Sequence, residues 1–192
     1  NKLQASTVLY PEIELNDVTV LGPDGSLQEF KRVHVQKKTK VLWEVIADMK
    51  RQGREDDIRK LLDLFIQTSV EELGRRGVWD AAKSFVLNWG VEFDRSGQPL
   101  AVNLFDFGEL TDDPIKIRES LIPNSWEKHW VIYDKNHPFS LASLAGPNIA
   151  DYFYEKVCKE FTPDNEILKS ALSKAGARLA TAAEPSGEKG SG

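Results

Sequence analysis

The sequence predicts an α+β fold that is mostly helical and carries two β-hairpins. Two observations identify the hairpins, since in each case a turn rich in Gly, Pro and Asp separates two short segments of apolar and β-branched residues. A third observation is the order of the elements, which runs hairpin, helices, hairpin, helices. This order is typical of an α+β protein and differs from the alternating pattern of a parallel βαβ fold.

The first hairpin is predicted from strands at 17–21 and 27–36, joined by the turn Gly22-Pro23-Asp24-Gly25. Glycine and proline in such a turn supply backbone conformations that reverse the chain, and they disfavour a continuous strand. Helices are expected next over 41–50, with Thr39 as the capping residue, and over 55–73. The longer helix is followed by the stop signal Gly74-Arg75-Arg76-Gly77.

The second hairpin is predicted from strands at 85–93 and 100–105, with turn residues at 94–99. Its last strand leads directly into Asp106-Phe107-Gly108. Further helices are expected over 114–121, 148–161 and 163–180. Asp112 and Asp113 are expected to cap the first of these, with Pro114 at its first position.

The stretch 126–133 has helical spacing of its aromatic residues but no clear type. The tail, 181–192, is small, polar and rich in Gly and Ser, which predicts disorder.

Bulk properties restrict the class of protein. A formal charge of −5 argues against a general nucleic-acid binder. The single cysteine, Cys158, rules out an internal disulfide, and no apolar run is long enough to span a bilayer. We therefore expect a cytoplasmic protein with neither nucleic acid nor membrane as partner. Because the chain begins with Asn1, it is expected to be either processed or a fragment.

Three polar residues around the second hairpin suggest chemistry. Asp106 leaves an apolar strand for a polar loop, and Asn88 lies near the start of the partner strand, so strand pairing is expected to bring them together. Carboxylate and amide oxygens are ligands that Mg²⁺ prefers. Asp80 precedes the hairpin and is a candidate to accept the proton of an attacking hydroxyl. Glu109 is an alternative metal ligand.

In this order of elements the sequence resembles the C-terminal lobe of the protein-kinase-like phosphotransferases. In that superfamily a long helix leads to a loop carrying an Asp and then an Asn, followed by a short hairpin and Asp-Phe-Gly. The resemblance implies that Asn88 and Asp106 hold Mg²⁺ and that Asp80 is catalytic.

The same resemblance implies a domain division and a nucleotide site. Residues 1–38 would be the remnant of a small β lobe and hinge, 39–180 the helical lobe, and 181–192 a tail. Backbone groups of His34, Val35 and Gln36 would meet the adenine of ATP. The partners implied are a nucleotide and an acceptor, either a protein or a small molecule, that the sequence does not specify.

The sequence also departs from the family pattern. Seven residues separate Asp80 from Asn88, whereas the family has four, and neither a glycine-rich phosphate loop nor a strand lysine is recognised. The alternative is therefore a non-catalytic pseudokinase or an α+β protein-interaction module. On that interpretation Asp80 is a turn carboxylate, Asn88 bonds its own backbone, and Asp106-Phe107-Gly108 is a structural turn.

Overall fold

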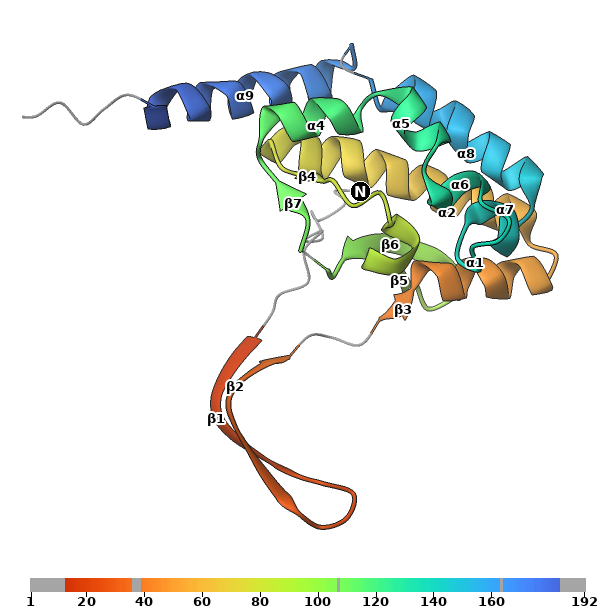
Figure 1. Ribbon diagram of the computed structural model, residues 1–192. Coiled ribbons are helices and arrows are strands. Elements are labelled where there is room, and N and C mark those ends of the chain that lie inside the picture. Colours follow the sequence, from red (N-terminus) through yellow and green to blue (C-terminus); the bar gives the residue numbers. More distant parts are fainter. Residues whose placement is uncertain (1–12, 36–38, 107, 163, 184–192) are drawn as a thin grey trace, which may run out of the picture.

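The computed structural model describes residues 13–35, 39–106, 108–162 and 164–183, and it has the predicted α+β architecture. Helices make up most of the body, and the strands form small antiparallel sheets. Figure 1 shows the first hairpin extending away from the helical body, while the second hairpin lies against it.

The first hairpin is confirmed and is longer at its start than the sequence predicted. It consists of β1 (Ile13–Leu21) and β2 (Leu27–Val35), which pair antiparallel with Leu21 opposite Leu27. In the turn, one carboxylate oxygen of Asp24 accepts hydrogen bonds from the Ser26 hydroxyl and amide at 2.6 and 3.0 Å. These bonds lower the pKa of Asp24.

The predicted Thr39 cap is wrong, because the residues before the first helix are held in a sheet. β3 (Lys40–Val41) pairs with β5 (Trp89–Phe93), and Val41 takes the capping position of α1 (Leu42–Arg51). The Thr39 hydroxyl instead donates to the Val91 carbonyl at 3.3 Å. A Cβ at Gly90 would lie 2.3 Å from the Thr39 methyl carbon, so this approach needs a glycine.

The long helix is confirmed in position, although its last turn is widened. α2 (Glu55–Thr68) continues into a π-helical turn, η1 (Ser69–Gly74), where the backbone bonds span one residue more. At the end of η1, a Cβ on Gly74 would lie 2.9 Å from the Leu168 side chain of α9 (Glu166–Ala183). Glycine here lets the two helices pack closely.

The core is built around aromatic side chains between α2 and α8 (Pro147–Glu160). Phe85 is 1% exposed and stacks on Phe65 and Phe153 with ring centroids 4.3 and 4.8 Å apart. Trp89 meets Phe65 edge-on at 5.0 Å. Aromatic pairs at such distances add to the free energy of burial.

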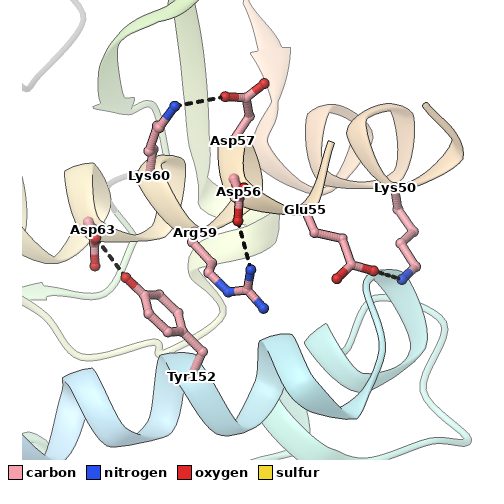
Figure 2. Close-up of polar contacts among 8 residues, drawn as sticks. All are labelled: Lys50, Glu55, Asp56, Asp57, Arg59, Lys60, Asp63 and Tyr152. Carbon is pink, nitrogen blue, oxygen red and sulfur yellow. Dashed lines mark hydrogen bonds and ion pairs between the residues drawn. The ribbon is translucent and has the colours of Figure 1, made fainter. Parts of the chain in front are cut away.

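Ion pairs cover the outer surface of this helical layer (Figure 2). On α2, Arg59 pairs with Asp56 at 2.9 Å, and Asp63 accepts a 2.7 Å hydrogen bond from the Tyr152 hydroxyl of α8. Lys50 pairs with Glu55 between α1 and α2. Exposed pairs of this kind contribute roughly 0–1 kcal/mol each, so the aromatic core dominates stability.

The helices after the second hairpin are largely as predicted. α4 (Pro114–Ser120) has Asp113 at its N-cap, where the carboxylate accepts the Ile115 amide at 2.8 Å. The stretch 126–133 contains parts of two short helices, α5 (Pro123–Glu127) and α6 (Trp130–Tyr133). They separate because the His129 ring nitrogen Nδ1 accepts the Val131 amide and begins a new helix. A further short helix, α7 (Leu141–Leu144), precedes α8.

The predicted start of the disordered tail is wrong, since α9 continues to Ala183. Alanine is the strongest helix former, and the alanine-rich end of this helix has no proline or glycine to stop it before Pro185. Residues 184–192 lie outside the described part. Within the described ranges, no helix is both long and apolar enough to cross a bilayer.

Truncation of Phe85 to alanine should destabilise the protein by about 3–5 kcal/mol, because it removes the ring between Phe65 and Phe153 and leaves a cavity. Chemical denaturation followed by circular dichroism measures the change in the free energy of unfolding. Ile115→Ala is the matched control, since Ile115 is 66% exposed, and it should change stability by less than about 0.5 kcal/mol. Equal effects of the two substitutions would contradict the assigned core.

Candidate functional site

Pairing of two short strands holds the segment around Asp80 beside the segment that follows Gly108. β4 (Trp79–Asp80) pairs antiparallel with β7 (Leu110–Thr111), with Asp80 opposite Leu110. One residue further on, the Ala81 amide donates to the Glu109 carbonyl at 3.1 Å. Residues about thirty positions apart in the sequence are thereby held side by side.

The second hairpin brings Asn88 next to Asp106, as the sequence predicted. β5 pairs with β6 (Pro99–Leu104), and just beyond the last pair the Asn88 carbonyl accepts the amides of Phe105 and Asp106 at 3.0 and 3.4 Å. This contact is made by the backbone. The Asn88 side chain is half-buried.

The predicted strand over 85–93 is wrong in its first half. Residues 85–88 form a single helical turn, α3 (Phe85–Asn88), and only Trp89 onward is strand. Both Phe85 and Val86 are buried, and a helical turn places adjacent side chains in the core, whereas a strand would point one of them outward. Asn88 therefore ends a helical turn at the start of β5.

Asp80 is a half-buried carboxylate held by two hydrogen bonds. One oxygen accepts the Ala82 amide at 3.0 Å, and the other accepts the indole Nε1–H of Trp89 at 3.2 Å. Burial raises the pKa of Asp80, the negative charges of Glu109 and Asp106 raise it further, and the two hydrogen bonds oppose this rise. The carboxylates of Glu109 and Asp106 thus lie close enough to act on that of Asp80.

Asp106 is exposed, in the loop that follows β6. Its Oδ1 accepts the Gly108 amide at 3.0 Å and so closes a tight turn. A Cβ on Gly108 would lie 3.3 Å from the same oxygen, so glycine leaves room for the turn. Phe107 lies outside the described residues.

An open cleft of about 500 Å³ lies beside this turn. Its lining combines both signs of charge, from Lys83, Glu109, Lys116 and Glu119. The volume falls in the range of small-molecule sites, about 300–1,000 Å³. Polar groups dominate this lining, which suits a polar ligand better than an apolar one.

Lys83 is a site residue that the sequence reasoning did not select. It has a left-handed backbone conformation with φ of 53°, which is uncommon for a residue other than glycine. Its ammonium group donates to the Ser125 carbonyl at 3.4 Å and lies 5.8 Å from the centre of the Trp126 ring. Burial lowers the pKa of Lys83, while the charge of Glu119 opposes this effect. The sequence signal that could have identified Lys83 was its position three residues after Asp80, between Asp80 and Asn88.

The residues assigned to adenine lie on a different element. His34 and Val35 end β2, opposite Glu14 and Ile13 of β1, in a hairpin separate from the sheet that contains Asp80 and from the sheet that precedes Asp106. Gln36 lies outside the described residues. The structure therefore groups Asp80, Asn88 and Asp106 but does not place the predicted hinge beside them.

Across the described part of the chain, no group of three or more His, Cys, Asp or Glu side chains is arranged to hold a metal ion. A site formed by Asp106 and Asn88 would be a smaller, oxygen-only set.

The chain matches no family model, no curated protein and no solved structure.

Substituting Trp89 with phenylalanine should raise the pKa of Asp80 further, because the lost indole N–H stabilises the charged carboxylate. Titration of the Asp80 side-chain carbonyl carbon by NMR measures this change directly. Trp43→Phe is the matched control, since Trp43 packs on Phe139 with ring centroids 5.0 Å apart, away from Asp80. If Trp89→Phe left the Asp80 titration where it is in the unmodified protein, the indole would not hold the carboxylate.

Proposed function

We propose that this chain carries the catalytic half of an ATP- and Mg²⁺-dependent phosphotransferase of the protein-kinase-like class. The observation that supports this most is the hydrogen bonding of Asn88 to the Asp106 backbone, combined with the pairing of β4 and β7. Together they gather Asp80, Asn88 and Asp106 from three separate segments. This is the set of residues that the resemblance assigns to catalysis and metal binding.

Asp106 and Asn88 would hold the magnesium ion. Asp106 is exposed and its Oδ1 accepts the Gly108 amide, and the side-chain oxygen of Asn88 would supply a second hard ligand from an adjoining segment. One or two protein oxygens are the usual set when phosphate and water complete the coordination. When bound, Mg²⁺ would neutralise the charge on the transferring phosphate.

Asp80 has the properties of a proton acceptor in this reaction. The γ-phosphoryl group would pass from ATP to a hydroxyl of the acceptor, which releases ADP, and the hydroxyl proton would go to the Asp80 carboxylate. The raised pKa makes the Asp80 carboxylate a stronger base, because its pKa lies nearer to the pH at which the reaction runs. The hydrogen bonds from Ala82 and Trp89 fix its orientation.

Lys83 supplies a positive charge at the cleft. In the family this charge comes from a strand lysine, and no such lysine is recognised in this sequence. The half-buried ammonium group of Lys83 donates to the Ser125 carbonyl and has further N–H groups that could donate to a phosphate. The polar cleft beside it is where an acceptor molecule would bind.

The longer spacing between Asp80 and Asn88 favours a second candidate, a non-catalytic pseudokinase or protein-interaction module. In that case the three polar residues would keep their structural hydrogen bonds without turning over ATP. Nucleotide binding and its dependence on Asp106 distinguish the two.

Asp106→Ala should weaken binding of Mg²⁺-ATP at least about tenfold, which corresponds to about 1.4 kcal/mol, because the metal loses its carboxylate ligand. Isothermal titration calorimetry with and without Mg²⁺ measures the affinity. Asp112→Ala is the control, since Asp112 is an exposed carboxylate a few residues further along. The proposal would be contradicted if Mg²⁺-ATP did not bind. It would also be contradicted if the affinity were the same without Mg²⁺ and in Asp106→Ala.

A further inference from the structure

Two buried polar side chains near Asp80 have no hydrogen-bond partner among the residues that the structure describes. They are the hydroxyl of Ser69, at the start of η1, and the indole Nε1–H of Trp79, in β4. These residues are only 4% and 3% exposed. An unpaired buried polar group lowers stability, and nearly all such groups in folded proteins are paired with protein atoms or with ordered water.

Both side chains line the same small cavity. Its volume is about 10 Å³, and Asp80 and Lys83 supply the other polar parts of its wall. Rings of the aromatic core, among them Phe65, form the rest. A cavity needs roughly 10–15 Å³ to hold one water molecule, so this one admits a single water and no organic ligand.

The polar groups of the wall select a neutral ligand over an ion. The Trp79 indole can only donate a hydrogen bond and the Lys83 ammonium group is positively charged, so both disfavour a cation. The Asp80 carboxylate, when ionised, only accepts hydrogen bonds and repels an anion. A water molecule both accepts and donates, and it therefore matches donors and acceptor together.

We propose that this cavity binds one water molecule, which accepts hydrogen bonds from the Ser69 hydroxyl and the Trp79 indole and donates one to the Asp80 carboxylate. Buried waters typically make about three hydrogen bonds, which is the number formed here. Asp80 already accepts the Ala82 amide and the Trp89 indole, but an ionised carboxylate offers about four lone-pair sites. The water site is a property of the folded chain and does not rest on the proposed phosphoryl transfer.

A high-resolution crystal structure of the complete chain tests the site directly. Electron density for a water should lie within about 3.2 Å of Ser69 Oγ, Trp79 Nε1 and one oxygen of Asp80. The proposal is wrong if the cavity contains no such density. It is also wrong if the Ser69 hydroxyl donates to the carbonyl of Phe65, four residues earlier, as serines in helices can.

Removal of the Ser69 hydroxyl gives an independent test in solution. With the water bound, Ser69→Ala should raise the equilibrium constant of unfolding about fivefold, because the water loses one of its hydrogen bonds. Without the water, the substitution would only remove an unpaired buried hydroxyl, and stability would stay the same or increase. Chemical denaturation distinguishes the two results.

Ser170→Ala is the matched control, since Ser170 is exposed on α9 and the substitution there reports only the helix-forming preference of alanine. It should leave the protein as stable as before or slightly more so. If Ser69→Ala had the same effect as Ser170→Ala, the Ser69 hydroxyl would have no hydrogen bond to lose and the proposal would fall.

The bond from the water to Asp80 is tested by the titration of that carboxyl group. Ser69→Ala should move the titration of the Asp80 side-chain carboxyl carbon, followed by NMR, to higher pH, because the donated bond that stabilises the charged form is weakened. Ser170→Ala should leave it unchanged. An identical titration in Ser69→Ala and the unmodified protein would overturn this bond. None of these measurements involves nucleotide, so their outcome is independent of the proposed activity.

Discussion

Phe85 lies between the rings of Phe65 and Phe153, and its burial determines the local path of the chain. To insert this ring, residues 85–88 form a helical turn where the sequence alone suggests a strand. That turn ends at Asn88, whose carbonyl then accepts the amides of Phe105 and Asp106. The aromatic stack therefore positions Asn88 directly, and it positions Asp106 through the backbone hydrogen bond to Asn88.

The environment of Asp80 follows from the same packing. Trp89 comes directly after the helical turn, is 1% exposed, and directs its indole N–H at the carboxylate. Burial disfavours the negative charge, and the nearby Glu109 and Asp106 add repulsion. The Trp89 and Ala82 hydrogen bonds stabilise the charged carboxylate and oppose that rise in the pKa of Asp80.

The helical body and the first hairpin are stabilised in different ways. The body buries a continuous apolar core that includes several aromatic rings, whereas the hairpin relies on its own ladder and on the turn held by Asp24.

Local patterns in the sequence determined the α+β class, the two hairpin turns, the start of α2 and the Asp113 cap of α4, because turns, caps and helical periodicity depend on neighbouring residues. Tertiary structure decided the rest. Residues 85–88 form a helical turn and not a strand because the Phe85 ring packs between Phe65 and Phe153. Val41 and not Thr39 caps α1 because β3 pairs with β5, which is distant in the sequence. The position of Lys83 and the raised pKa of Asp80 likewise come from residues far away in the sequence. Only the folded chain brings those residues close enough to exclude water and to make their charges felt.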